Sequence, residues 1–124
     1  MEKTVITATA RQIADEYLRA WLAGEVDKAL ALIADDVVCE APTGRITGLA
    51  GYRQFLEPFA TTLVRGELVD VLGDDEHAAT VYVVDTPAVK DIRGMEYLTV
   101  TDGKITHVVS VFDRLPIAKA RSQG

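Results

Sequence analysis

The sequence predicts a single α+β domain, in which a cone-shaped, curved sheet of antiparallel or mixed strands wraps around three helices from the N-terminal half. Helical periodicity dominates the first half of the chain, and strand-like alternation dominates the last third. No linker, repeat or low-complexity tract divides residues 1–124. Because a strongly twisted sheet around helices leaves a hollow that is open at one end, we expect a half-open barrel with an apolar pocket.

The first helix is expected at about residues 10–22. Thr9 is a suitable N-cap, because its hydroxyl can accept from a free backbone N–H, and Gly24 is a suitable stop. Apolar side chains recur every four residues on one face of this helix. They are Ile13, Tyr17 and Trp21.

Two further helices follow in the first half of the chain. The second is expected at about residues 26–34, before the acidic pair Asp35-Asp36. The third begins after Gly48 and carries bulky apolar side chains, namely Tyr52, Phe55, Leu56 and Phe59. Pro58 lies within the third helix and lacks a backbone N–H, so we expect a kink or a restart about one turn earlier.

The rest of the chain alternates between apolar and polar residues and predicts six strands. They are expected at residues 37–41, 45–47, 67–72, 78–86, 93–101 and 104–113. Asp102-Gly103 forms the tight turn between the last two strands. The tail after Pro116 is short and basic, and we expect it to fray.

Composition and charge limit the possible functions. Apolar residues make up 48% of the chain and charged residues 26%, as in soluble globular proteins. The net charge of −6 disfavours nucleic acid as a partner, because phosphate backbones are bound by clustered Lys and Arg. Residues 1–6 lack the apolar run of a signal peptide, and no stretch approaches the roughly 20 apolar residues that span a bilayer. We expect a soluble cytoplasmic protein with no membrane partner.

Residues that bind metals or cofactors are sparse. The single cysteine, Cys39, excludes an internal disulfide and fits a reducing cytoplasm. The two histidines, His77 and His107, are isolated and have no metal-ligand spacing. The sequence also lacks a glycine-rich phosphate-binding loop. We therefore expect no metal and no cofactor.

Several motifs, spread over nearly the whole chain, are typical of one superfamily. They are Tyr17, residues 29–37 (ALALIADDV), Gly48, residues 102–106 (DGKIT) and residues 111–113 (VFD). Together they resemble the nuclear transport factor 2-like superfamily, which includes ketosteroid isomerases, limonene-epoxide hydrolases and SnoaL-type polyketide cyclases. The resemblance implies a conical pocket for an apolar small molecule and a homodimer formed through the outer face of the sheet. It specifies no reaction, because this fold hosts many chemistries and many non-catalytic binders.

Alternation places polar residues of the last three strands among apolar ones. The sets that share a face are Asp85 with Val83, Glu96 with Leu98, and Ser110 with Val108 and Phe112. The resemblance implies that these three sets face the pocket. Burial would raise the pKa of Asp85 and let it transfer a proton near neutrality. The alternative is a solvated Asp85 at the end of its strand.

The resemblance implies a different role for these residues in each family. Asp85 corresponds in position to the acid of limonene-epoxide hydrolases, but Val83 and Ser110 stand where that family has an arginine and a second aspartate. Glu96 and Ser110 correspond to the acid–base pair of SnoaL-type cyclases, and only Glu96 can titrate. Each of these two matches is therefore incomplete.

Ketosteroid isomerases offer another partial match. Glu96 corresponds to a protonated aspartate that donates to an oxyanion, and Tyr17 corresponds to the tyrosine that donates beside it. Ala41 stands where the isomerase has its base, and Leu56 replaces a tyrosine of that hydrogen-bond network. Asp85 could then serve as a relocated base.

The first functional hypothesis is a cofactor-independent small-molecule enzyme of the isomerase, cyclase or hydrolase type. It would use acid–base catalysis on an apolar ligand that carries a carbonyl group or a ring. Asp85 would transfer the proton, and Ser110 would assist. Glu96 and Tyr17 would polarise an oxygen of the ligand. The ligand-binding residues would be Trp21, Cys39, Phe55, Phe59, Val83, Leu98, Val108 and Phe112.

The second hypothesis is a non-catalytic module of the same fold, which binds a ligand or forms a dimer without catalysing a reaction. Three positions favour this hypothesis, because the related enzymes have catalytic groups there and this chain does not. These residues are Ala41, Val83 and Ser110. The polar residues Glu96, Tyr17 and Asp85 favour the enzyme instead. Polar groups that converge in an apolar pocket are costly to bury, which indicates a functional reason for keeping them.

Overall fold

The computed structural model describes residues 8–123, which fold into four helices and one six-stranded sheet. The helices are α1 (Ala10–Leu22), α2 (Val26–Leu30), α3 (Leu49–Ala60) and α4 (Leu115–Gln123). The strands are β1 (Ile33–Ala41), β2 (Gly44–Thr47), β3 (Arg65–Gly73), β4 (His77–Asp85), β5 (Ile92–Thr101) and β6 (Lys104–Phe112). The predicted α+β class is confirmed. The expectation about residues 1–6 lies outside the described residues.

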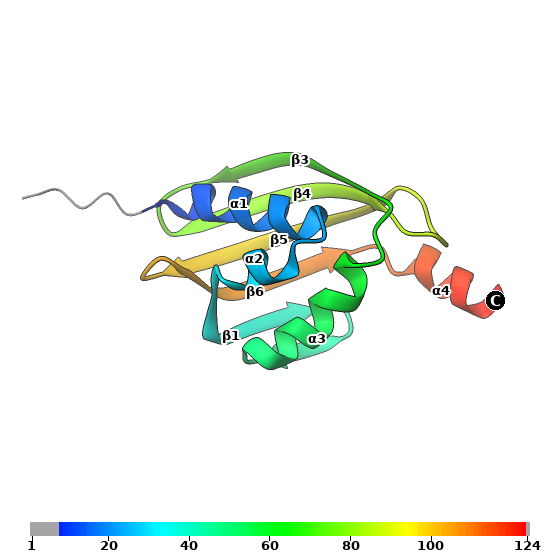
Figure 1. Ribbon diagram of the computed structural model, residues 1–124, viewed down its shortest axis with the longest axis horizontal. Coiled ribbons are helices and arrows are strands. Elements are labelled where there is room, and N and C mark those ends of the chain that lie inside the picture. Colours follow the sequence, from blue (N-terminus) through cyan, green and yellow to red (C-terminus); the bar gives the residue numbers. More distant parts are fainter. Residues whose placement is uncertain (1–7, 124) are drawn as a thin grey trace, which may run out of the picture.

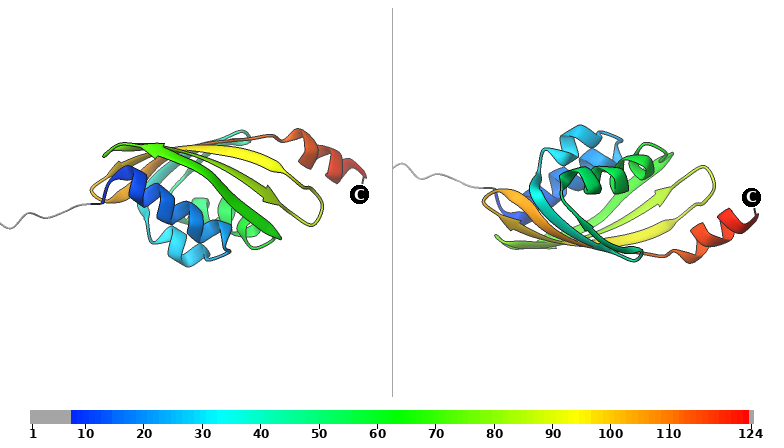
Figure 2. Two further views of the ribbon diagram at one scale, coloured as in Figure 1. Left: turned by 90° about the horizontal axis from the view of Figure 1, so that it is seen from above. Right: turned by 90° about the horizontal axis from the view of Figure 1, so that it is seen from below.

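All six strands belong to one mixed sheet with the order β2-β1-β6-β5-β4-β3. β1 and β6 run parallel, and all other neighbours are antiparallel. The sheet is strongly curved, and α1, α2 and α3 lie against its concave face (Figure 1, Figure 2). The sheet does not close on itself, because β2 and β3 remain as free edges. The predicted half-open, cone-like shape is therefore confirmed.

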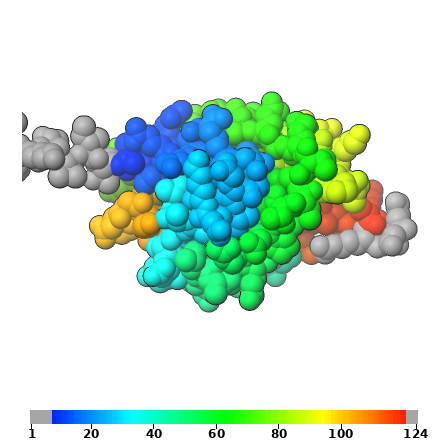
Figure 3. Space-filling model, in the orientation of Figure 1, coloured from blue at the N-terminus to red at the C-terminus, as the bar shows by residue number. Residues whose placement is uncertain are grey.

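The hydrophobic core fills the space between the concave face and the three helices. Its largest fully buried side chains include Trp21, Tyr17, Tyr52, Leu18, Ile92 and Leu98. In the space-filling view the helices cover most of this face, while α4 and the loop after β4 lie at one end (Figure 3). Within residues 8–123, no helix has the length and apolar character that crossing a membrane requires.

α1 begins and ends at the residues that the sequence indicates. Thr9 and Gln12 form a capping box, and the N–H groups of Ala10 and Arg11 donate to carbonyl groups in the loop before β4. Gly24 adopts a positive φ just after the helix. The apolar stripe of α1 is buried against the sheet, as predicted.

The boundary between the second helix and the first strand differs from the prediction. α2 ends at Leu30 and β1 begins at Ile33, where we expected helix as far as Ala34. The cause is the neighbouring strand β6, because Ile33 pairs with Ile105 and the N–H of Ile105 donates to the carbonyl of Leu32. A pairing between distant parts of the chain thus overrides the local helical pattern.

α3 continues through Pro58, so the predicted restart before this residue does not occur. Pro58 cannot donate a backbone hydrogen bond to the carbonyl of Gln54, so the helix lacks this one bond, and it ends two residues later at Ala60. The hydroxyl groups of Thr61 and Thr62 donate to the carbonyls of Glu57 and Phe59 and help to end the helix.

The C-terminal segment forms α4, so the expectation that the tail after Pro116 frays is wrong. The carboxylate of Asp113 accepts from the N–H of Leu115, which caps the start of the helix. Pro116 lies in the first turn, where a missing N–H costs little. Ile117 packs against the edge of the hydrophobic core. The Asp113 cap, the favourable position of Pro116 and the packing of Ile117 together explain why the tail is helical.

Candidate active site

Three buried polar residues form a row across the concave face of the sheet. Thr80 of β4 pairs with Glu96 of β5, which pairs in turn with Ser110 of β6. Directly paired residues point to the same face of a sheet, so these three side chains lie side by side. Each of them is at most 4% exposed. A polar row in an otherwise apolar interior indicates a functional site.

This register corrects the predicted orientation of β4. We expected Asp85 and Val83 to share the pocket face with Glu96. The pairing of Thr80 with Glu96 instead places Asp85 and Val83 on the outer side of the strand, and neither of them lines the cavity described below. Alternation shows which residues of a strand share a face, but the register with the neighbouring strands decides which face points inward.

A cavity of about 690 Å³ opens beside the polar row. Its walls come from the concave face of the sheet, from α3 and α4, and from the loop between β4 and β5. Six of the residues predicted for the site line it: Trp21, Phe55, Phe59, Glu96, Ser110 and Phe112. The volume falls within the range of small-molecule sites, roughly 300–1,000 Å³.

Glu96 is the acid inside this cavity. Burial raises the pKa of its carboxyl group from 4.5 to about 8, and the neighbouring Ser110 hydroxyl and Trp21 indole lower it only in part. The carboxyl group is therefore mostly protonated at neutral pH, and its two protonation states are close in free energy. Such a group can donate or accept a proton near neutrality.

Three polar atoms near Glu96 have no hydrogen-bond partner of normal geometry within the described part of the chain. They are Nε1 of Trp21, Oε1 of Glu96 and Oγ1 of Thr80. The indole N–H of Trp21 is close enough to lower the pKa of Glu96, but the contact does not reach the geometry of a normal hydrogen bond. A buried polar atom without a partner costs roughly 1–3 kcal/mol. A ligand oxygen beside Trp21 and Glu96 would provide the missing partner.

Tyr17 and Tyr52 form a hydrogen bond between their hydroxyl groups near Glu96. Both side chains are fully buried, and desolvation raises the pKa of each well above its usual range, with the charge of Glu96 as a further cause. Both hydroxyl groups are therefore neutral at physiological pH. Tyr17 does not line the cavity, so a ligand in this cavity would not meet its hydroxyl group as predicted.

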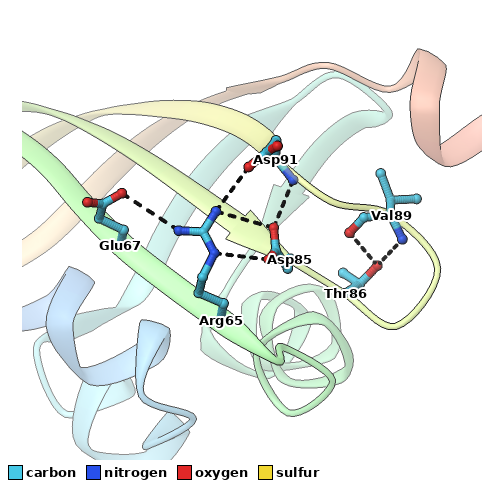
Figure 4. A network of polar contacts seen from close by, with 6 residues as sticks. All are labelled: Arg65, Glu67, Asp85, Thr86, Val89 and Asp91. Carbon is cyan, nitrogen blue, oxygen red and sulfur yellow. Dashed lines mark hydrogen bonds and ion pairs between the residues drawn. The ribbon is translucent and has the colours of Figure 1, made fainter.

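Asp85 belongs to a network of ion pairs at the end of β4 (Figure 4). Its carboxylate accepts from the guanidinium of Arg65 at 2.9 Å and from the backbone N–H of Asp91 at 2.8 Å. These contacts hold the pKa of Asp85 below its usual range, and the bond from Arg65 is the main cause. The predicted rise in the pKa of Asp85 is wrong, because its carboxylate contacts the guanidinium of Arg65 and not the apolar wall that we expected. Asp85 is a fixed anion that holds the loop after β4.

Three predicted ligand-binding residues lie in the core without reaching the cavity: Cys39, Leu98 and Val108. Desolvation, together with the charges of Glu96 and Glu40, raises the pKa of the Cys39 thiol to about 12. The thiol is therefore a packed and unreactive group. Leu98 and Val108 pair with each other one step beyond the polar row, so the cavity occupies only the other end of these strands.

Tyr82 forms a part of the cavity wall that the sequence does not reveal, and its position depends on Gly94. Gly94 pairs with Tyr82, and a Cβ atom at Gly94 would lie only 2.2 Å from Cζ of the Tyr82 ring. The ring of Trp21 packs edge-on against Tyr82, with centroids 5.0 Å apart. The missing side chain of Gly94 thus lets Tyr82 lie across β5 and shape the wall.

Sequence reasoning also missed Tyr52, Thr80 and Arg114. Tyr52 lies one helical turn before Leu56 on the same face of α3, so the i, i+4 spacing could have identified it as the tyrosine that Leu56 was expected to replace. Thr80 could be recognised only from the strand register. Arg114 lines the outer end of the cavity beyond β6, and no sequence motif indicates this position.

Within residues 8–123, no three His, Cys, Asp or Glu side chains converge in a way that could hold a metal ion. His107 contacts Glu40 at 2.8 Å, and His77 stacks on Tyr97. The polar groups that line the cavity include the carboxyl group of Glu96, the hydroxyl group of Ser110 and the indole N–H of Trp21.

The curved sheet, the helices on its concave face and the cavity between them define the class of protein with a nuclear transport factor 2-like fold, and solved proteins described as NTF2-like share this architecture. Within this class, residues 14–108 match the SnoaL-like domain. The chain belongs to the SnoaL-like domain family.

Solved structures show the same architecture. A crystal structure from Kribbella flavida, described as a "known function protein", is 38% identical, covers 93% of this chain and 95% of its own, and has a TM-score of 0.90. A "putative ketosteroid isomerase" from the same organism is 25% identical over 84% of this chain and 77% of its own, with a TM-score of 0.74. A "putative polyketide cyclase" from Pseudomonas putida is 21% identical over 91% of this chain and 98% of its own, with a TM-score of 0.69, and shows the fold alone. None of the curated proteins matches this chain.

Proposed function

We propose that this chain is a cofactor-independent enzyme of the isomerase or cyclase type, which moves a proton on an apolar ligand that carries a carbonyl group or a ring. Glu96 carries the proposal, because it is an acid buried in the cavity with one unpaired oxygen and a pKa near 8. Acids perturbed in this way concentrate at functional sites. The names given to two structural relatives, a ketosteroid isomerase and a polyketide cyclase, fall in the same reaction classes.

In the proposed mechanism, ionised Glu96 takes a proton from the carbon next to the ligand carbonyl, and the electron pair of that C–H bond moves toward the carbonyl oxygen. The indole N–H of Trp21 has no partner within residues 8–123 and donates to this oxygen as negative charge develops on it. Where a C=C bond adjoins the deprotonated carbon, the enolate electrons extend over it, and Glu96 returns the proton to the far carbon of that bond while the double bond shifts, which completes an isomerisation. The high pKa of Glu96 makes its carboxylate a stronger base than a solvated one.

Exchange of ligand protons with solvent tests this proposal. β-Tetralone is an apolar cyclic ketone, and in D₂O the protein should speed the loss of its α-proton NMR signal. Glu96→Gln should reduce the accelerated rate at least about 100-fold, since general acid–base groups contribute this much. Glu16→Gln, which changes an exposed carboxyl group on α1, is the control and should exchange like the wild type.

A ligand-binding module without catalysis is the second candidate. It is favoured because Glu96 is the single carboxyl group among the described residues that line the cavity, and Asp85 is tied to Arg65 outside it. In this candidate the protonated Glu96 donates a hydrogen bond to a ligand oxygen and no proton leaves carbon. Binding of β-tetralone with no acceleration of exchange would support this candidate and contradict the enzyme.

We also propose that two copies pair through the outer face of the sheet. Large apolar side chains are about half exposed or more on this face, at Leu72, Met95, Tyr97 and Val111. Met95 pairs with Val111 across β5 and β6, and Tyr97 and Leu72 both pair with Ala79 of β4, so these residues form one continuous outer-face patch. A two-fold pairing would bury the outer-face patch of both copies at once.

A further inference from the structure

The cavity runs from a buried polar end to a cationic outer end. Ser110, Phe112 and Arg114 follow each other at two-residue steps, and all three line the cavity. At about 3.3 Å per residue in a fully extended chain, the backbone of Arg114 lies at most about 13 Å from that of Ser110. Ser110 is buried beside Glu96, whereas Arg114 is exposed. The wall between these two ends is mainly apolar, with Phe112 at its centre.

Arg114 forms no ion pair with any described residue, although the chain has 19 acidic residues against 13 basic ones. The acids of the adjoining segments bond to other groups. Asp113 accepts from the N–H of Leu115 at the start of α4. Asp85 and Asp91, at the two ends of the loop that lines the cavity, both accept from Arg65 (Figure 4).

Arg114 is also the single side chain in the described lining that is charged at neutral pH, because burial keeps Glu96 mostly protonated. A guanidinium group binds a carboxylate through two parallel hydrogen bonds, which are stronger than bonds between neutral groups. Arg114 can therefore supply both charge and geometry to an anionic ligand at the outer end. Its unpaired charge also attracts anions locally in a chain whose net charge is −6.

We infer that the cavity binds an apolar carboxylic acid, with its carboxylate on Arg114 and an uncharged carbonyl or hydroxyl oxygen beside Trp21 and Glu96. The inference rests on the proposed function, since the same cavity holds the ligand and Glu96 acts on the same end of it. The opposite orientation is disfavoured, because a carboxylate beside Glu96 would lose its hydration without gaining a cation. The apolar body of the ligand would lie along Phe112.

A pair of probes that differ only in charge tests this inference. Benzoylvalerate is a phenyl ketone with a carboxylate at the end of its alkyl chain, and its methyl ester is the neutral counterpart. Calorimetric titration should show the acid binding at least about tenfold more tightly than the ester, which equals about 1.4 kcal/mol. Trp21 is the single tryptophan of the chain, so a change in its fluorescence reports that the ligand reaches the buried end of the cavity beside this indole.

Arg114→Gln should remove the preference for the acid and leave the affinity for the ester unchanged. Arg93→Gln is the matched control, because Arg93 is also exposed and unpaired among the described residues but does not line the cavity, so the preference should persist. Equal binding of acid and ester by the wild type, or an unchanged preference in Arg114→Gln, would overturn the inference and leave the proposed function standing. Failure of both probes to bind would contradict the inference and the proposed ketone site together.

Discussion

Glu96 and Asp85 are acids on neighbouring strands, and their pKa values depart from the ordinary range in opposite directions. Asp85 accepts from Arg65 at the end of β4, so its ionised form is stabilised. Glu96 is buried, and its desolvation disfavours the ionised form more than the Ser110 hydroxyl and the Trp21 indole favour it. At the scale of single residues, the surroundings decide which acid can exchange a proton near neutrality.

The buried carboxyl group of Glu96 makes stability depend on pH. Its pKa rises from 4.5 to about 8 on folding, so the folded state holds one more proton than the unfolded state between these values. The stabilising contribution is fully present below the unfolded pKa and is lost as pH rises through the folded pKa. The slope can reach about 1.4 kcal/mol per pH unit in this window. Glu96→Gln cannot ionise, so this part of the pH profile should be flat in the variant.

Urea unfolding at several pH values from about 5 to about 8 measures this effect. The wild type should lose stability relative to Glu96→Gln as pH rises, and Glu16→Gln should follow the wild type. Parallel profiles for wild type and Glu96→Gln would mean that the carboxyl group is solvated, and the basis for proton transfer by Glu96 would be gone.

At the scale of elements, β5 gives the cavity its shape through a residue without a side chain. The ring of Tyr82 on β4 occupies the space in which a side chain at Gly94 would lie. Tyr82 in turn packs against Trp21 of α1, so one glycine links two strands and a helix at the cavity wall. This arrangement depends on the antiparallel register of β4 and β5, which pairs Gly94 with Tyr82.

Gly94→Ala should therefore damage both stability and binding. The added Cβ would lie 2.2 Å from Cζ of Tyr82, and the ring would have to move toward Trp21 and the cavity. Overpacking of this kind costs about 1–3 kcal/mol, which urea unfolding would detect, and β-tetralone should bind more weakly. In combination with Tyr82→Leu the clash is absent, so the double variant should lose less stability than the sum of the single variants. A Gly94→Ala protein as stable as the wild type would contradict the observed position of the ring.

At the scale of the whole molecule, the two faces of the sheet present different surfaces. The helices lie on the concave face (Figure 2), which also holds the polar row and the cavity, whereas the opposite face presents the outer-face patch. Glu96 and its neighbour Met95 in β5 point to opposite faces, so a single strand contributes to both surfaces. Substitutions on the two faces can therefore separate binding in the cavity from association of copies.

The outer-face patch predicts a homodimer, which sedimentation should detect at micromolar concentration. Met95→Glu or Val111→Glu would place a charge in the interface and should produce monomers that still bind β-tetralone. Val64→Glu is the control, because Val64 is 66% exposed but lies outside the sheet, so this variant should remain a dimer. A wild-type monomer at this concentration would contradict the proposed pairing.

Much of the fold could be predicted because its signals are local. The Thr9 cap, the buried stripe of α1 and the Asp102-Gly103 turn all depend on residues close together in the chain, and each is present in the structure. Other features depend on distant contacts and could not be predicted from local patterns. β1 begins early because Ile33 pairs with Ile105, which lies far along the chain.

The candidate site divides in the same way. The sequence by itself determined that Glu96 shares a face with Leu98 and that an acid there sits among apolar neighbours, because side-chain direction along a strand follows a period of two. Only the tertiary structure decided that Thr80 joins this face, that Asp85 meets Arg65, and that the Glu96 carboxyl group is left without a cation. Register, burial and the pairing of charges arise when distant segments meet, and the pattern of one segment cannot specify them.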